Sequence, residues 1–135
     1  MVNFLIAATT LFISINLFYF FTNKTYRKSY FSTALFLKLF SVLTVVLIGF
    51  GLLYYLLSLK EVILVDSLSD PQTIEPTFLD LLYFSGVTLL SIGYGDMVPV
   101  GSARFFALLQ SAIGILLPTA YFMKALDSSE KSQEN

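Results

Sequence analysis

The segment 88–96 carries the most specific chemical pattern in this chain, with glycines at alternate positions, Gly93 and Gly95. A dehydrated cation needs oxygen ligands in place of its water, and backbone carbonyls supply them when successive carbonyls point to one side. Such a run needs left-handed dihedral angles at some positions, which glycine adopts at little steric cost. The hydroxyl of Ser91 adds one more oxygen at the start of the run. The pattern therefore predicts a carbonyl ladder that binds a cation.

The composition is typical of a membrane protein. Of the 135 residues, 56% are hydrophobic and only 13% are charged, which is more apolar surface than a soluble domain of this length buries. The net charge of −1 does not favour nucleic acid binding. The sequence has no cysteine and no histidine, which excludes disulfides, thiol catalysis and the usual zinc sites. Since no cluster of bases or nucleophiles is evident, we do not expect an enzyme.

Three stretches without charged residues are long enough to cross a membrane: Val2–Phe21, Leu39–Leu59 and Phe105–Met123. About 20 apolar residues in a helix cross the hydrocarbon core, and a helix satisfies its own backbone polar groups in lipid. A signal peptide is the alternative for the first stretch, but the positive charges follow the apolar run rather than precede it. We therefore predict an all-α membrane protein with three transmembrane helices.

A fourth apolar stretch, Leu81–Gly95, is too short to cross the membrane. Thr77 and Asp80 before it match a capping box, which predicts a short helix from about residue 78 to residue 90, followed by a loop. A helix that enters the membrane without crossing it must end against protein or a water-filled cavity. Its negative C-terminal dipole would favour a cation at that end. We therefore predict a re-entrant helix that leads into the carbonyl ladder.

Charge placement predicts the orientation in the membrane. Basic residues lie in or beside the connection between the first two spans, whereas the segment 61–102 contains acidic residues and no lysine or arginine. The positive-inside rule then places the connection 22–38 and the C-terminus in the cytoplasm and the N-terminus outside. The basic residues are Lys24, Arg27, Lys28 and Lys38, and the acids are Glu61, Asp66, Asp70, Glu75, Asp80 and Asp96. Tyrosines near both faces fit either an aromatic belt or ordinary scatter: Tyr19, Tyr26, Tyr30, Tyr54 and Tyr55.

The segment Ser91–Asp96, which reads Ser-Ile-Gly-Tyr-Gly-Asp, resembles the potassium-channel signature, commonly written Thr-Val-Gly-Tyr-Gly-Asp. The resemblance covers residues 34–126 and is to the two-helix pore domain of prokaryotic potassium channels, with an additional N-terminal helix here. It implies a selectivity filter in which four chains surround the ion. The ligands that it implies for K⁺ are the backbone carbonyls of Ser91, Ile92, Gly93 and Tyr94 and the Ser91 hydroxyl, with Gly95 completing the filter. Ser91 keeps the oxygen of the usual threonine but lacks its methyl group.

The resemblance also implies that residues near the filter support it. Thr88 and Asp96 flank the filter, and Tyr83 and Phe84 stand where the family has a cuff of aromatic side chains. Tyr83 would donate a hydrogen bond to Asp96 behind the filter, and simple packing of Tyr83 is the alternative. Many relatives place a glutamate where this chain has Val87. The Asp96 side chain is therefore expected to have fewer partners than in those relatives.

Gly114 and Pro118 lie four residues apart in the last apolar stretch. Proline lacks an N–H, and its ring clashes with the carbonyl four residues back, here that of Gly114. The resemblance implies that the inner helix of the pore bends at this point, so we predict a gating hinge. The alternative is that Gly114 serves close packing, since Ala107 and Ser111 form a small-x-x-x-small pattern in the same stretch.

The predicted organisation has three parts: an N-terminal helix with a basic loop over 1–33, a pore domain over 34–126, and a frayed polar tail over 127–135. The predicted function is passive conduction of K⁺ through a homotetramer in the plasma membrane of a prokaryote. The expected partners are further copies of this chain and membrane lipid, with no nucleic acid. No cofactor is expected besides K⁺ in the filter. The sequence leaves undecided whether a separate regulatory subunit also binds. The alternatives are a channel that also passes Na⁺ and a non-conducting membrane subunit that regulates or anchors a partner.

Overall fold

The structure, a computed structural model, describes residues 1–22, 33–66 and 72–134. Its elements are the helices α1 (Val2–Thr22), α3 (Thr33–Ser58), α4 (Phe78–Leu89) and α5 (Ala103–Gln133), and the short strands β1 (Leu64–Val65) and β2 (Val98–Pro99). The helices α1, α3 and α5 are long and apolar enough to cross a membrane, and α4 is a shorter apolar helix. The prediction of an all-α membrane protein with three spanning helices is thereby confirmed.

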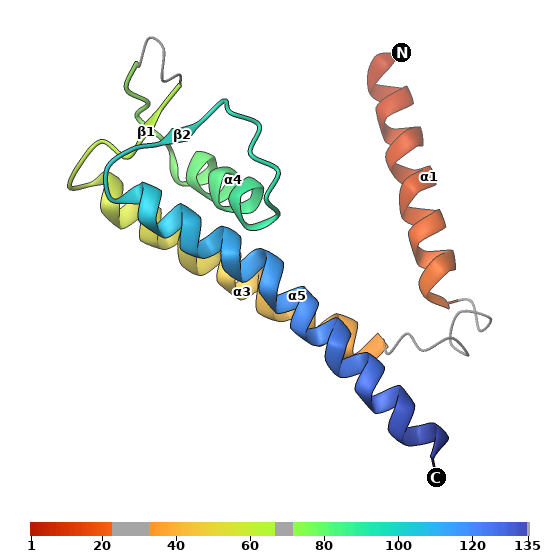
Figure 1. Ribbon diagram of the computed structural model, residues 1–135. Coiled ribbons are helices and arrows are strands. Elements are labelled where there is room, and N and C mark those ends of the chain that lie inside the picture. Colours follow the sequence, from red (N-terminus) through yellow and green to blue (C-terminus); the bar gives the residue numbers. More distant parts are fainter. Residues whose placement is uncertain (23–32, 67–71, 135) are drawn as a thin grey trace.

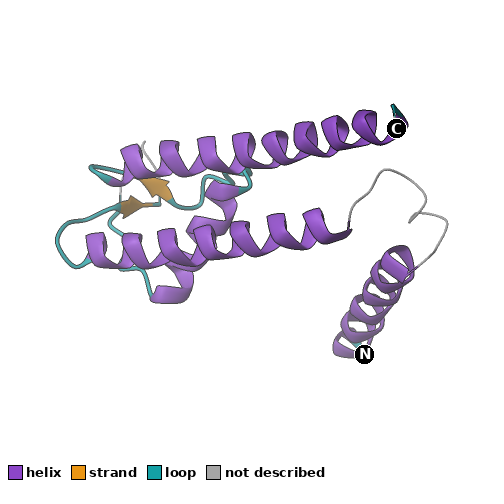
Figure 2. Ribbon diagram, turned by 90° about the horizontal axis from the view of Figure 1, so that it is seen from below, coloured by secondary structure: helices purple, strands orange, loops and turns teal. Residues whose placement is uncertain are grey.

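The helices α3 and α5 run alongside each other in opposite directions (Figure 1). Figure 2 shows α4 and both strands at one end of this pair, and the start of α3 and the C-terminus at the other end. The described part of the acidic segment 61–102 therefore lies at one end of the α3–α5 pair. The start of α3 and the C-terminus, which were predicted to be cytoplasmic, lie at the other end. Of the basic residues behind the predicted orientation, Lys38 lies in α3 and is exposed. The others (Lys24, Arg27 and Lys28), together with Tyr26, Tyr30 and Asp70, lie outside the described residues.

The helix α1 stands apart from the other helices (Figure 1). Its apolar side chains are exposed along most of its length, including Phe4, Phe12 and Phe18. Polar side chains in α1 turn back onto their own helix: the hydroxyl of Thr10 donates to the Ile6 carbonyl at 2.8 Å. Thr9, Ser14, Asn16 and Thr22 make the same kind of bond four residues back. Because these groups are satisfied locally, α1 can face lipid on all sides.

A capping box starts α4, as predicted. The Thr77 backbone N–H donates to Oδ2 of Asp80 at 2.8 Å, and the Asp80 N–H donates to the Thr77 hydroxyl oxygen at 3.3 Å. Hydrogen bonds from the side chain and the backbone of Thr77 lower the pKa of Asp80. The carboxylate is therefore charged at neutral pH, which suits the positive end of the helix dipole.

Two short strands join the chain on either side of the filter segment. β1 and β2 pair antiparallel, with Leu64 opposite Pro99 and Val65 opposite Val98. The Val100 N–H extends the pairing by donating to the Ile63 carbonyl at 2.8 Å. The sequence analysis predicted no strands here. The pairing holds the segment after the predicted filter against the segment that follows α3.

The helix α5 continues further than the sequence analysis predicted. The polar tail from residue 127 was expected to fray, but the helix runs to Gln133. A salt bridge between Lys131 and Asp127, one turn apart, measures 3.1 Å, and the Ser128 hydroxyl donates to the Lys124 carbonyl. Local pairs of this kind support an exposed helix end. The boundary at residue 127 therefore marks a change in polarity and not the end of the helix.

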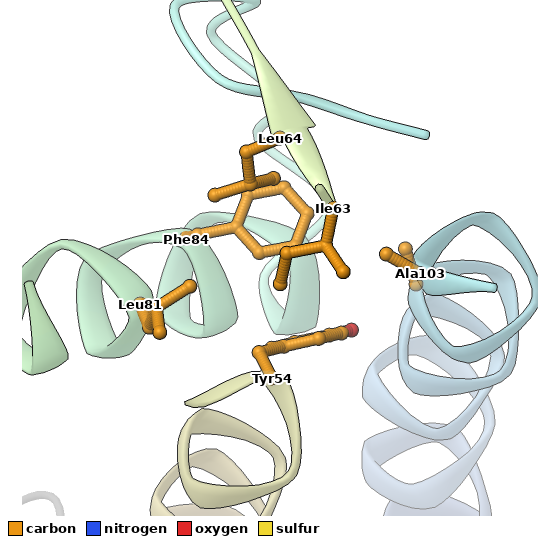
Figure 3. Close-up of a cluster of buried hydrophobic side chains, with 7 residues drawn as sticks. Tyr54, Ile63, Leu64, Leu81, Phe84 and Ala103 are labelled. Atoms are coloured by element: carbon orange, nitrogen blue, oxygen red, sulfur yellow. The ribbon is translucent and has the colours of Figure 1, made fainter. Parts of the chain in front are cut away.

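The hydrophobic core lies where α3, α4, β1 and the start of α5 meet. Its members are Tyr54, Ile63, Leu64, Leu81, Phe84, Ala103 and Ala107. The ring of Tyr54 packs edge-on against Phe84, with centroids 5.0 Å apart, a favoured arrangement for aromatic pairs. Figure 3 shows the Tyr54 ring crossing the cluster with its hydroxyl toward α5. Of the two alternatives for the tyrosines, the aromatic belt does not apply to Tyr54, since this side chain is completely buried, whereas Tyr55 is partly exposed.

Candidate ion-conduction site

The pore helix α4 ends in a Schellman motif that sets the start of the predicted filter. The Ile92 N–H donates to the Val87 carbonyl at 2.9 Å, and the Ser91 N–H donates to the Thr88 carbonyl at 3.0 Å. In this motif the residue after the helix cap adopts a left-handed conformation, usually as glycine. Ser91 holds that position with φ +56°. A β-branched residue is strained at positive φ, which gives a physical reason for serine where the potassium-channel signature has threonine.

Left-handed residues alternate through the segment Ser91–Gly95. Gly93 has φ +56° and Gly95 has φ +84°. Among the described residues Ser91 is the only non-glycine residue with positive φ, so Ile92 and Tyr94 between these positions lack it. The left-handed dihedral angles predicted for the two glycines are thus present. Alternation of this kind is what a run of carbonyls on one side of the chain requires.

The filter segment borders a hollow of about 570 Å³ in the single chain. Its walls come from α4, the segment after it and the first half of α5, and they include Val87, Thr88, Ser91, Tyr94, Asp96 and Ser111. Ile92 and Tyr94 are 46% and 69% exposed. Beside water, such apolar and aromatic surface is normally covered by protein. The site as one chain presents it is therefore open on one side.

The residues predicted to support the filter lie close to it. The phenol of Tyr83 is near enough to the Asp96 carboxylate to interact with it. Phe84 is buried in the core, and Val87, which was expected to stand in place of the glutamate of many relatives, is also buried. The Thr88 carbonyl accepts the Ser91 N–H and, at 3.1 Å, the Ser111 hydroxyl. Asp96 directly follows the predicted filter segment in the chain and borders the same hollow.

Gly114 packs against the last turn of α4. A Cβ atom built on Gly114 would lie 1.7 Å from the Leu89 carbonyl oxygen and 2.8 Å from its carbon. No side chain fits there, so the two helices approach each other only because residue 114 is glycine. Pro118 lies inside α5, which is helical on both sides of it. The close-packing alternative for Gly114 is therefore observed, whereas a bend at Gly114 and Pro118 stays a prediction.

A buried polar cluster between α4 and α5 was not predicted from the sequence. Gln110 of α5 and Ser85 of α4 are completely buried, and both are hydrogen-bonded. The available signal was Gln110 itself, the only amide side chain in the stretch Phe105–Met123. Ser, Thr, Asn and Gln side chains within a membrane span can hydrogen-bond across to a partner on another helix. The identity of that partner depends on how the helices pack, which the sequence pattern did not reveal.

These features define a membrane pore domain, and comparison with known proteins agrees. The ion channel family model matches residues 42–128, which is more than half of the chain. The chain therefore belongs to this ion channel family and has the pore domain of the potassium-channel type. The match starts within α3 and includes α4, the filter segment and most of α5. The helix α1 lies outside it.

Individual relatives fall into two groups. Protein LctB of Geobacillus stearothermophilus is 33% identical over 87 residues, which cover 63% of this chain and 65% of that protein. Protein LctB of Bacillus caldotenax is 35% identical over 74 residues, covering 53% and 55%. Two pore potassium channel b of Oryza sativa subsp. japonica is 33% identical over 91 residues, covering 65% and 26%. The chain thus spans less than two thirds of each relative, and no solved structure gives a significant match.

Proposed function

We propose that four copies of this chain form a potassium-selective channel that conducts K⁺ passively. The observation that carries the proposal is the alternation of left-handed residues through Ser91–Gly95 at the end of the short apolar helix α4. Membership of the ion channel family supports conduction, and the similarity to a plant protein named as a potassium channel supports the choice of ion. The family is one of channels and not of enzymes.

In this proposal the backbone of Ser91, Ile92, Gly93 and Tyr94 supplies the ligands. Their carbonyls, and the Ser91 hydroxyl at the inner end, replace the water around a K⁺ ion. One chain offers one strand of the filter and cannot encircle an ion, so symmetry-related copies must complete each ring. The exposed faces of Ile92 and Tyr94 are the surfaces that those copies would cover. The C-terminal end of α4 adds a negative partial charge toward the ion.

We further propose that the chain lies in a prokaryotic plasma membrane with the segment 61–102 outside and the C-terminus in the cytoplasm. The acid-only charge of that segment supports this orientation. The chain has no native cysteine, so single cysteines can report the side directly. A membrane-impermeant thiol reagent added outside is expected to label Asp66→Cys and not Tyr26→Cys. Labelling of Tyr26→Cys from outside alone would contradict the orientation.

Tyr83 is proposed to hold Asp96 in place behind the filter. Because Val87 replaces the glutamate of many relatives, few other polar groups are available for this task. Tyr83→Phe removes only the hydroxyl, and we expect conduction to decline faster during sustained opening. The measurement is the time course of current in a lipid bilayer. Unchanged kinetics would leave Tyr83 with a packing role alone.

Pro118 is proposed to set the bend of the inner helix on opening. Proline removes one backbone hydrogen bond and crowds the carbonyl of Gly114. Pro118→Ala restores that bond, so a straighter α5 becomes more stable and the open probability is expected to fall. Single-channel recording measures this directly, and the K⁺ over Na⁺ selectivity should stay as in the parent. An open probability equal to that of the parent would indicate that the gate lies in another part of the chain.

Flux into liposomes tests the proposed function against its alternatives. Purified protein is reconstituted, and uptake of K⁺ and of Na⁺ is measured separately. Uptake of K⁺ without Na⁺ is the expected result. Comparable uptake of both ions indicates a less selective channel. Protein that is assembled in the liposomes but passes neither ion indicates a non-conducting membrane subunit.

A further inference from the structure

Three buried side chains from three helices form one hydrogen-bonded network near the filter. The Tyr54 hydroxyl on α3 donates to Oε1 of Gln110 on α5 at 2.9 Å. The Gln110 amide donates to the hydroxyl of Ser85 on α4 at 2.7 Å and to the Ser85 carbonyl at 3.1 Å. The Ser85 hydroxyl donates to the Leu47 carbonyl at 2.7 Å. The chain of donors therefore starts and ends on α3 and passes through α5 and α4.

All of the polar groups in this network are satisfied and shielded. Tyr54, Ser85 and Gln110 each have 0% exposure. Within the described part of the chain, no buried side-chain nitrogen or oxygen lacks a hydrogen-bond partner. In a membrane no water replaces a partner that moves away, and a buried polar group without a partner is costly. The network therefore opposes any displacement of one of these helices relative to the other two.

The network is continuous with the contacts that hold the end of α4. Gln110 and Gly114 lie one turn apart on one face of α5, and Ser111 lies next to Gln110 and three residues before Gly114. The Ser111 hydroxyl donates to the Thr88 carbonyl at 3.1 Å, and Gly114 lies directly against the Leu89 carbonyl. Leu89 is the last residue of α4, and the filter segment starts two residues later. Neighbouring residues of α5 thus contact the last turn of α4, which leads into the predicted filter.

We propose that Gln110 is a positioning residue that locks α4 to α5, so that movement of α5 reaches the filter through α4. This inference rests on the proposed function as a potassium channel and concerns the gating of that site. Gln110 suits the task because its amide holds a donor and an acceptor on one rigid group. It therefore binds α3 and α4 at the same time. Without the Gln110 amide, α4 is no longer held in one position relative to α5. The conducting form of the filter then becomes less populated.

The test uses the full chain in planar lipid bilayers with K⁺ solution on both sides. Gln110→Leu has similar size and no polar group. We expect its open probability to fall about tenfold or more, since each copy loses neutral hydrogen bonds that act together. The unitary current and the reversal potential in mixed K⁺ and Na⁺ should match the parent. Thr44→Val is the matched control, because the Thr44 hydroxyl donates only to the Phe40 carbonyl of its own helix.

A double-mutant cycle separates positioning from general stability. If Gln110 acts through Ser85, then Gln110→Leu combined with Ser85→Ala should gate like Gln110→Leu alone. Effects that multiply would overturn the proposal. So would a Gln110→Leu protein that is less heat-stable but gates normally. If Gln110→Leu fails to assemble, Tyr54→Phe removes one hydroxyl from the same network and should lower the open probability in the same direction, and normal gating of Tyr54→Phe would then overturn it.

Amide hydrogen exchange tests the lock without any current. Exchange at residues 85–93 is expected to be about tenfold faster in Gln110→Leu than in the parent, and unchanged in Thr44→Val. Equal exchange in Gln110→Leu and the parent would overturn the lock itself. A parent protein that passes no K⁺ but shows the faster exchange in Gln110→Leu would contradict the proposed function and leave the lock in place. The two failures are therefore distinguishable.

Discussion

Gly93→Ala is expected to abolish potassium current while the chain still inserts into the membrane. Gly93 has φ +56°, and an L-residue in a left-handed conformation costs about 1–2 kcal/mol. If four copies form the pore, the cost is about 4–8 kcal/mol, and the conducting form becomes at least about a thousandfold less populated. A Cβ atom on Gly93 meets no atom within 4 Å in the single chain. The effect should therefore arise from the backbone and not from a clash within the chain.

Gly49→Ala provides the matched control for this substitution. Gly49 lies inside α3, and a Cβ atom there also meets nothing within 4 Å. Alanine favours a helix by roughly 1 kcal/mol over glycine, so this variant should conduct like the parent. Both variants are compared by single-channel recording at equal amounts of assembled protein. A parent-like K⁺ current in Gly93→Ala would contradict the carbonyl ladder.

Gly114→Ala is expected to weaken the assembly and to disturb the filter. The added methyl would start 1.7 Å from the Leu89 carbonyl oxygen, about half of an ordinary carbon–oxygen contact of about 3.3 Å. Overpacking typically costs about 1–3 kcal/mol per site, which exceeds the roughly 1 kcal/mol that alanine gains in helix propensity. The end of α4 must move away from α5, and the filter follows. Thermal unfolding of the purified protein and its K⁺ current should both report the change.

Gly86→Ala is the control for Gly114→Ala. Gly86 lies in α4, and its nearest neighbour for an added Cβ atom is a methyl carbon of Leu47 at 3.6 Å, an ordinary contact. The stability and the K⁺ current of the Gly86→Ala variant should stay close to those of the parent. If Gly114→Ala is as stable as the parent and conducts as well, then α4 and α5 separate at no cost. In that case neither close packing nor a hinge would require glycine at residue 114.

The capped helix α4 and the left-handed glycines after it were predictable because local sequence determines them. Thr77 and Asp80 specify the start of α4 through contacts three residues apart. The glycines at positions 93 and 95 predict left-handed dihedral angles by their residue type alone. The left-handed Ser91 was not predictable in this way, because serine is common in ordinary backbone. It follows from the hydrogen bonds that end α4, which only the folded chain displays.

The buried network was not predictable because its parts are far apart in the sequence. Tyr54 and Gln110 are separated by 56 positions, and a tyrosine near the end of a span fits an aromatic belt equally well. The packing of Gly114 against Leu89 likewise depends on the position of α4 relative to α5. Hydropathy predicted that these helices exist, but it contains no information on which faces meet.

The reversal potential of the current through purified, reconstituted protein measures K⁺ selectivity, the property that the proposed filter would give this chain. K⁺ and Na⁺ are placed at equal concentration on opposite sides of the bilayer, and the voltage of zero current is recorded as the K⁺ concentration is varied. We expect a reversal potential that follows the K⁺ gradient and ignores the Na⁺ gradient, because the proposed ladder Ser91–Gly95 would coordinate dehydrated K⁺. A reversal potential of zero with equal K⁺ and Na⁺ on the two sides would contradict it.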